Sequence, residues 1–428
     1  MISPPRRSAF EILRQIESGS AFSDDALNSR TINCLEPRDR NLTTEIVYGT
    51  LRWQLLLDHV LSKVVARPWN EVGAGIRILL RMSLHQMWHM DRVPDHAIVH
   101  DAVELAKRGS TQIGASGFVN GVLRTLSRNR PWQQAEFTSQ IPPWVRASLP
   151  PWLWERWAGR FGEERAMDYA ISLNQPPRHC LRIRRGEGTP NPELGAAISS
   201  SDIVPGAYFS DGSLHTPGSS MQDEASQLIA HLLGPILRGH IWDACAAPGG
   251  KSAILCDKCG TSGFVVSSDS RWTRVQQVRR ALHGQTPAPL LLVADATRAA
   301  PFVASFDAVL ADVPCSGLGT LRRNPEIKWR FRAERFGSLQ QKQTSVLQAV
   351  AKVVRGGGLL LYSTCSTEPE ENEQVVDAFL ESHNDFRLVR PTFPPGIEAW
   401  ADKRGFVRTF PSTRLWDSFF AALMVRFS

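Results

Sequence analysis

Two hydrophobic patterns divide this chain. Between Arg6 and about Arg130, apolar side chains recur every three to four residues, the spacing of helices that bury one face. Representative faces carry Phe10, Leu13 and Ile16; Ile98, Ala102, Leu105 and Ala106; and Phe118, Val122 and Leu126. Proline-containing breaks near residues 37, 68 and 94 separate the helices. We expect an all-α segment of six or seven helices.

Beyond Met221, short strand-like runs alternate with helical ones. The strand candidates are residues 240–244, 263–268, 289–294, 306–311, 358–363 and 419–426. Such alternation is typical of a doubly wound α/β fold with a mainly parallel sheet. Ligands of these folds bind beyond the carboxyl ends of the strands, so the polar residues there are the candidates for function.

The stretch between these patterns has its own character. Residues 131–143 are rich in proline and polar side chains, which indicates a linker, and residues 175–185 enter a basic strand. Four tryptophans cluster in this stretch. We expect most of them to pack within a small subdomain and not to stack on RNA bases; they are Trp144, Trp152, Trp154 and Trp157. We predict three parts, an all-α domain at 1–130, a linker with a small Trp-rich subdomain at 131–205, and an α/β domain at 206–428.

Composition limits the kinds of partner and the cellular compartment that we expect. Lys and Arg outnumber Asp and Glu by 49 to 42, and the net charge of +7 favours polyanionic partners without identifying one. The first residues lack the apolar core of a signal peptide, and no run is long enough to span a bilayer. Seven scattered cysteines argue against a disulfide framework. We expect a cytoplasmic monomer with reduced thiols and no membrane association.

The run Asp243–Ser252 has the pattern of a buried strand end, a small-residue turn with two glycines, and a helix start. A phosphate-binding P-loop would need its first glycine where Cys245 stands, and the glycine pattern of a dinucleotide fold is absent. A methyltransferase instead needs a short loop near the methionine part of S-adenosylmethionine and an acid after the second strand for the ribose hydroxyls. Asp269 suits that ribose role, and Asp295 suits a bond to the adenine amino group.

Carboxylates follow four successive strand candidates, at Asp243, Asp269, Asp295 and Asp312. In a parallel sheet these positions share one edge, which favours a common site. The alternative is that one or two of them cap the helices that follow.

Two cysteines also follow strand ends, Cys315 in Asp-Val-Pro-Cys-Ser-Gly and Cys365 in Tyr-Ser-Thr-Cys-Ser-Thr. Their polar turns at the ligand side of one sheet favour reactive thiols over buried apolar ones. Metal sites are not expected: Cys256 and Cys259 lack a second ligand pair, and the paired histidines at 85 and 89 and at 96 and 100 lack the accompanying glutamate of a zinc protease.

Taken together, these motifs resemble the RNA cytosine-5 methyltransferases of the RsmB/Nop/Sun family. The catalytic-domain motifs are Asp243-Ala-Cys-Ala-Ala-Pro-Gly-Gly-Lys-Ser252, Asp312-Val-Pro-Cys-Ser-Gly317, Arg322-Arg-Asn-Pro-Glu-Ile-Lys-Trp329 and Ser363-Thr-Cys-Ser366. The N-terminal motifs resemble the NusB-like domain of the RsmB branch: Pro37-Arg-Asp-Arg40, Val47-Tyr-Gly-Thr-Leu-Arg-Trp53, Pro94-Asp-His-Ala97 and Val119-Asn-Gly-Val-Leu-Arg124. The resemblance implies an all-α NusB-like RNA-binding domain joined to a Rossmann-like class I methyltransferase domain.

The resemblance also implies residue roles. Cys365 would attack C6 of a cytosine so that C5 takes a methyl group from S-adenosylmethionine, Cys315 would assist product release, and Asp312 would bond the cytosine edge. The implied cofactor-binding residues are Cys245, Ala246, Ala247, Pro248, Gly249, Gly250, Lys251, Asp269, Asp295 and Asp312. Residues 321–332 interleave cations with Trp329 and Phe331, so we expect them to contact phosphates and stack on a flipped or single-stranded target.

Two positions depart from the family pattern. Arg184 replaces a usual asparagine, and Ser418 replaces the glycine of a usual Asp-Gly-Phe-Phe turn, which leaves the last turn less certain.

We therefore expect a cytosine-C5 methyltransferase of 16S rRNA or of a small-subunit precursor. One alternative is methylation of tRNA or another rRNA site. The other is a non-catalytic NusB-like RNA-binding factor, which would not bind S-adenosylmethionine.

Overall fold

The chain folds into two compact units. The computed structural model describes residues 2–109, 114–134, 137, 141–183, 198–210, 219–236, 239–260, 262–302 and 305–427. The first unit comprises Met1–Gln175 together with Leu321–Arg330, and the second comprises Pro176–Thr320 together with Phe331–Ser428. We predicted domain boundaries near residues 130 and 205. These boundaries remain a prediction, because a compact unit is not necessarily a domain that folds on its own. Arg184 lies outside the described residues.

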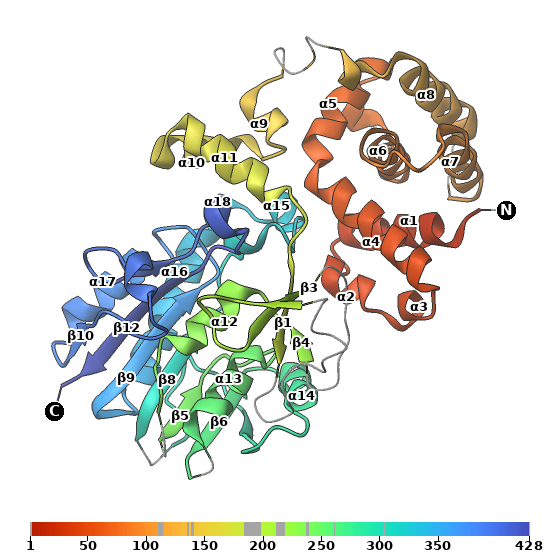
Figure 1. Ribbon diagram of the computed structural model, residues 1–428. Coiled ribbons are helices and arrows are strands. Elements are labelled where there is room, and N and C mark those ends of the chain that lie inside the picture. Colours follow the sequence, from red (N-terminus) through yellow and green to blue (C-terminus); the bar gives the residue numbers. More distant parts are fainter. Residues whose placement is uncertain are drawn as a thin grey trace. The chain divides into compact units, whose positions relative to one another are not determined.

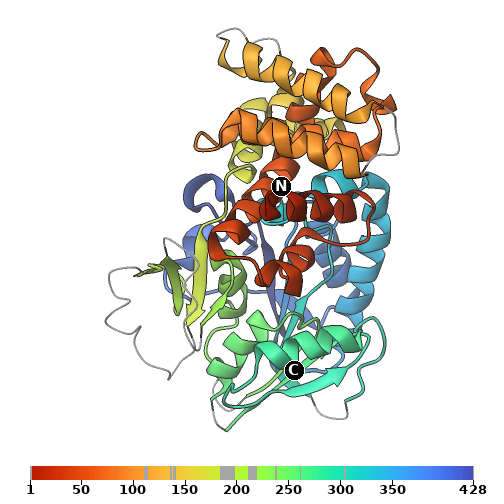
Figure 2. The same ribbon diagram turned by 90° about the vertical axis from the view of Figure 1, so that its right-hand side faces the viewer.

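The first unit is helical, as predicted; its N-terminal helices are drawn in red to orange (Figure 1), and Figure 2 gives a second view of them. Eight α-helices occupy the described part of the region where six or seven were expected, because α2 and α3 are too short to show a periodic pattern. Pro37 is the first residue of α4, and Pro94 immediately precedes α7, as the sequence breaks indicated. The α-helices of this unit are α1 (Pro4–Glu17), α2 (Ser23–Leu27), α3 (Arg30–Asn33), α4 (Pro37–Arg52), α5 (Gln54–Val64), α6 (Ala74–His89), α7 (Asp95–Gly109), α8 (Ala115–Asn129), α9 (Pro143–Arg146), α10 (Pro151–Phe161), α11 (Glu163–Leu173) and α15 (Ile327–Arg330).

Aromatic side chains pack inside this unit as expected. Trp154 and Trp157 on α10 are buried, and Trp144 packs beside Val145 and Ile141 in a small cluster. His85 is buried against Gly49, where an added Cβ would come within 1.9 Å of the imidazole. Burial lowers the pKa of His89 to about 4, so this imidazole is neutral at pH 7.

The second unit contains a sheet with the order β10-β12-β9-β8-β5-β6-β7, and β11 pairs with β12. The five strands from β9 to β7 run parallel to their neighbours, while β10, β11 and β12 pair antiparallel. All six predicted strands are present, within a few residues of the expected bounds. The strands are β5 (His240–Asp243), β6 (Phe264–Asp269), β7 (Leu290–Val293), β8 (Phe306–Asp312), β9 (Val354–Thr364), β10 (Phe386–Leu388), β11 (Val407–Arg408) and β12 (Phe420–Arg426).

Alternating side chains divide this sheet between two apolar layers. Ile241 belongs to the layer formed with α12 (Glu224–His231) and α13 (Gly250–Cys259), whereas Trp242 belongs to the layer formed with α16 (Phe336–Ala351) and α17 (Glu373–Ser382). These helices cover opposite faces of the sheet (Figure 1). The remaining helices of this unit are α14 (Trp272–Ala281) and α18 (Pro411–Arg414). The predicted α/β fold is confirmed.

A smaller antiparallel sheet precedes this fold, with the order β2-β3-β1-β4. The predicted basic strand corresponds to β1, but the other three short strands were not predicted. Runs of three or four residues are too short to show alternation. The strands are β1 (His179–Ile183), β2 (Ile198–Ser200), β3 (Ala207–Ser210) and β4 (Ser219–Met221).

Candidate active site

The run Asp243–Ser252 forms the predicted strand, turn and helix start, from β5 into α13. Gly249 adopts φ +116°, and its Cβ would lie 3.2 Å from that of Ala281. A Cβ on Gly250 would come within 2.9 Å of the Gln222 side chain. Glycine is therefore required at position 249 by its backbone conformation, whereas a side chain at position 250 would displace the end of the Gln222 side chain.

Asp243 stabilises the turn through a buried hydrogen bond. Its Oδ2 accepts a 2.6 Å hydrogen bond from Ser252 Oγ, and the carboxyl is buried. Burial raises the pKa of Asp243 to about 7, with the Ser252 bond acting in the opposite direction. Its bond to Ser252 joins the end of β5 to the start of α13, so the role of Asp243 is to stabilise the loop between them.

The other three carboxylates face a common cavity of about 710 Å³. Asp312, Asp269 and Asp295 end or follow β8, β6 and β7, which lie in the same part of the sheet as β5. The cavity also takes in Cys315 and Cys365, so it unites the predicted strand-end acids with both predicted cysteines. Its size falls within the roughly 300–1,000 Å³ of typical small-molecule sites.

Asp269 and Asp295 differ in their surroundings. Asp269 is buried, with Arg274 Nε 3.3 Å from its Oδ2 and the backbone N–H of Arg271 donating to its Oδ1. Asp295 is 44% exposed and accepts bonds from both the backbone and the hydroxyl of Thr297, which lower the pKa of Asp295. These bonds close a local turn, no helix directly follows Asp295 in the described residues, and the carboxylate lines the cavity.

Lys251 and Asp312 form an ion pair at the cavity wall. Lys251 Nζ lies 2.7 Å from Asp312 Oδ2, and Ser363 Oγ donates to Asp312 Oδ1 at 2.7 Å. Burial opposes the charge of Lys251, but the charges of Asp312 and Cys365 outweigh it, so the pKa of Lys251 is raised. Lys251 is therefore a stable ammonium at the cavity wall.

The two cysteine turns meet at the ends of neighbouring strands. β8 and β9 are paired in parallel, with Asp312 opposite Ser363, and the Sγ atoms of Cys315 and Cys365 lie 3.1 Å apart. The hydrogen bond to Cys365 is the largest cause that raises the pKa of Cys315 well above its usual range, followed by burial. Cys315 is consequently held as a thiol at neutral pH, beside Cys365.

Backbone hydrogen bonds hold these turns in place, and they include the turn at Ser418 before the last strand. The N–H of Gly319 donates to the Cys365 carbonyl, and the N–H of Ser418 donates to the Gly319 carbonyl. Ser418 does not adopt a positive φ, so serine satisfies the turn where the family pattern has glycine.

The comparisons agree with this architecture. A family model described as 16S rRNA methyltransferase RsmB/F matches residues 230–425, and a NusB family model matches residues 3–128. The probable ribosomal RNA small subunit methyltransferase B of Bacillus subtilis (strain 168) is 34% identical, and the alignment covers 89% of each chain. The ribosomal RNA small subunit methyltransferase B of Thermus thermophilus is 32% identical, over 96% of this chain and 97% of that one. This chain belongs to the RsmB/F family. It combines the family's methyltransferase domain with an N-terminal NusB domain, as the sequence motifs predicted.

Solved structures support the fold of this RsmB/F member. A structure titled "Crystal Structure of PH0851" has a TM-score of 0.79 at 24% identity and covers all of both chains. A methyltransferase homolog from Pyrococcus horikoshii has a TM-score of 0.57 at 23% identity, over 68% of this chain and 99% of that one.

The structure contradicts one expectation about RNA contacts. Phe331 is buried against Phe336, and Trp329 packs on the core of the first unit while its Nε1 donates to the Leu51 carbonyl. Lys328 is fully buried in the same unit. Residues 321–332 were predicted to contact phosphates and bases. Lys328 and Arg330 instead donate to carbonyl oxygens within the helical unit, whereas Arg332, at the end of the run, is exposed.

The other chemical candidates occupy structural positions. Cys256 and Cys259 are both buried on α13, as expected for residues without a catalytic role. Within the described ranges, no group of three or more His, Cys, Asp or Glu side chains is placed to hold a metal ion. No helix in those ranges is long and apolar enough to cross a bilayer.

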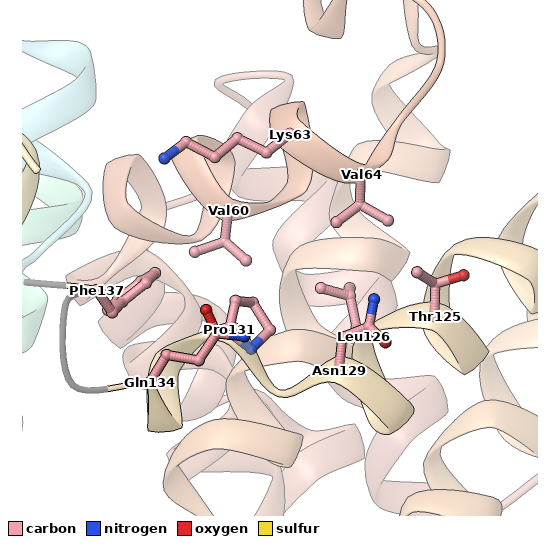
Figure 3. Close-up of a pocket in the computed structure, with 9 residues that line it drawn as sticks. All are labelled: Val60, Lys63, Val64, Thr125, Leu126, Asn129, Pro131, Gln134 and Phe137. Atoms are coloured by element: carbon pink, nitrogen blue, oxygen red, sulfur yellow. The ribbon is translucent and has the colours of Figure 1, made fainter. Parts of the chain in front are cut away.

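A second cavity, of about 280 Å³, lies within the helical unit (Figure 3). Figure 3 shows Val60, Lys63 and Val64 above it, and Leu126 and Asn129 below it. None of its lining residues is a cysteine or a carboxylate. The cavity beside Cys365 contains such groups, and an adjoining cavity of about 290 Å³ shares Cys245 and Asp312 with it.

Proposed function

We propose that this protein methylates C5 of a cytosine in 16S rRNA, through a covalent bond between Cys365 and C6 of the base. The observation that carries this proposal is the 3.1 Å approach of the Cys315 and Cys365 sulfurs in a cavity with strand-end carboxylates. A single reactive thiol would suit many reactions. Two thiols at one base suit a reaction that forms a carbon–sulfur bond and later breaks it.

The residues of the cavity fit S-adenosylmethionine. Asp269 provides a buried carboxylate at the end of β6 for the two ribose hydroxyls, and Asp295 provides an acceptor for the adenine amino group. The turn from Cys245 to Lys251 gives the methionine part close access to the backbone. The cofactor supplies an electrophilic methyl group on a sulfonium ion and leaves as a neutral thioether.

Cys365 begins the proposed reaction as a thiolate. Its sulfur forms a bond to C6, and the electrons of the C5–C6 double bond become available at C5, which then bonds to the methyl group. Asp312 bonds the cytosine edge and stabilises the polarised ring. The C5 proton is lost to water, and its C–H electrons restore the C5–C6 double bond as the S–C6 electrons return to sulfur, so the Cys365 thiolate is regenerated; Cys315 assists this release. A base stacked in a helix could not reach the sulfur, so the target is single-stranded or flipped out.

The direct test uses small-subunit rRNA that carries 5-fluorocytosine. Fluorine at C5 cannot leave as a proton, so the protein should remain attached to RNA through a bond that survives denaturing electrophoresis, provided S-adenosylmethionine is present. RNA with ordinary cytosine is the control. Attachment to tRNA but not to small-subunit rRNA would overturn the choice of substrate, and no attachment to any RNA would overturn the covalent mechanism.

Replacing Asp269 with alanine should weaken S-adenosylmethionine binding by about 100-fold, because bonds to a charged group contribute about 1.5–3 kcal/mol. Isothermal titration calorimetry measures this loss, and RNA affinity should change little. Asp377→Ala removes an exposed carboxylate on α17, paired with Arg404, and should leave cofactor affinity unchanged. Equal cofactor affinity in Asp269→Ala and the unsubstituted protein would contradict the ribose assignment. A protein that binds no S-adenosylmethionine at all would favour the non-catalytic RNA-binding alternative.

A further inference from the structure

Glu371 is a buried carboxylate for which the proposed reaction has no use. Four neutral donors surround it. Its Oε1 accepts the backbone N–H of Ser316 at 2.7 Å and Gln343 Nε2 at 3.0 Å. Its Oε2 accepts the hydroxyls of Ser316 and Ser366, each at 2.5 Å. A buried charge is costly unless hydrogen bonds compensate it, and this one is compensated by groups from three separate segments.

The donors adjoin the two reactive cysteines. Ser316 directly follows Cys315, and Ser366 directly follows Cys365. Gln343, on α16, also donates to the carbonyl of Pro314, the residue before Cys315, at 3.1 Å. One carboxylate therefore bonds to both cysteine turns.

We propose that Glu371 is a positioning residue, whose carboxylate clamps the turn after Cys315 to the turn after Cys365 and so sets the distance between the two sulfurs. The chemical roles of the sulfurs rest on the proposed function, but the clamp does not. Because a misplacement of about 1 Å at a reacting centre costs about 100-fold in rate, the clamp has a direct consequence for turnover.

The charge of Glu371 gives the clamp a second effect. The pKa of Cys315 is raised by its bond to Cys365, by burial, and then by the negative charges of Cys365 and Glu371. Tyr362 is a further ionisable group near Cys315, with its own pKa raised by burial. On the opposite side, Lys251 pairs with Asp312, and the pKa of Lys251 is raised. Glu371 thus helps to keep Cys315 protonated.

The test is the pH dependence of alkylation of each cysteine by iodoacetamide, read by mass spectrometry, together with steady-state methylation kinetics. In Glu371→Gln the pH midpoint for Cys315 should fall by about one unit, because a nearby like charge has been removed. The kcat should fall about 100-fold, with KM for RNA within about twofold of the original value. General loss of structure would instead expose Cys180 and Cys256, which are buried and serve as internal reporters.

Glu371→Asp separates positioning from charge, and it carries the test if Glu371→Gln exposes the reporters. The shorter side chain keeps its charge but cannot span both turns, so the Cys315 midpoint should stay near its original value while kcat falls. Glu381→Gln makes the same chemical change at an exposed site of α17 and should alter neither quantity.

Unchanged kcat in Glu371→Asp would overturn the clamp. In a folded Glu371→Gln variant, an unchanged pH midpoint for Cys315 alkylation would contradict the proposed effect of the Glu371 charge. Alkylation requires neither RNA nor cofactor, so it tests the effect of the Glu371 charge on Cys315 even if the unsubstituted protein fails to attach to 5-fluorocytosine RNA. That failure would overturn the proposed function alone.

Discussion

Replacing Cys365 with alanine is expected to abolish both methyl transfer and the covalent complex with 5-fluorocytosine RNA. Loss of an attacking nucleophile typically lowers turnover by about 10⁴-fold or more. Cys315 should not substitute for it, because the raised pKa of Cys315 keeps that sulfur protonated at neutral pH, and a thiol is a poor nucleophile. Denaturing electrophoresis of the trapped RNA measures attachment, and tritium transfer from labelled S-adenosylmethionine measures methylation.

Replacing Cys315 with alanine should give a different result. Cys365 remains able to form its bond to C6, so attachment should persist even to RNA with ordinary cytosine, and release of the methylated product should slow. Cys34→Ala, at an exposed site in the helical unit, should match the unsubstituted protein in both assays. If Cys315→Ala abolished attachment and Cys365→Ala retained it, the nucleophile would be Cys315.

The site was predictable where its residues follow from the geometry of a parallel sheet. Strand ends at Asp269, Asp312 and Cys365 share one edge because neighbouring strands run in the same direction, and the strands themselves are marked by apolar runs. Recognising the strands therefore placed the acids and both cysteines in one region. The distance between the sulfurs did not follow, since it depends on the paths of two turns and on the bonds that join them.

The Glu371 clamp was not predictable from the sequence. Glu371 lies among Glu368, Glu370 and Glu373, and nothing in that acidic run distinguishes the carboxylate that bonds to both cysteine turns; Glu368 is buried as well. Besides the nearby Ser366, its donors come from α16 and from the turn after β8, 28 and 55 residues away in sequence. Such a contact appears only when the sheet brings the segments together.

The error about the RNA contacts of residues 321–332 has a related cause. Alternating cations and aromatics indicate an RNA-binding surface, but the same pattern suits a segment that inserts into a helical unit and bonds its free carbonyls. Arg330 donates to the carbonyls of Ile16 and Ala21, and Glu326 accepts the backbone and hydroxyl of Ser23. The partners lie about 300 residues away, so local sequence could not reveal them.

Lys328 is the centre of this inserted segment, and Lys328→Met is expected to lower the free energy of unfolding of the helical unit by about 3 kcal/mol. Its Nζ donates to the carbonyls of Arg52 and Ser148 at 3.2 Å and to Asn174 Oδ1 at 2.5 Å. Methionine fills the space of the aliphatic part of the lysine side chain, but it leaves these three buried acceptors without their hydrogen bonds to Nζ. Differential scanning calorimetry of the full chain should show the transition of the helical unit at a lower temperature. Lys63→Met, at an exposed site of the same unit, is the control and should leave it unchanged.

The effect of Lys328→Met should also depend on pH. Burial, with a smaller contribution from the charge of Arg52, lowers the pKa of Lys328 from its usual 10.5 to about 7. Between these values the unfolded chain binds the proton that the folded unit has released, so raising the pH through this window stabilises the unsubstituted protein. Methionine has no such proton, and the stability difference between the two proteins should therefore widen from about pH 7 towards pH 10. A difference that stays constant with pH would show that Lys328 has the same pKa folded and unfolded. An unchanged transition temperature at every pH would show that its three bonds contribute nothing to the unit.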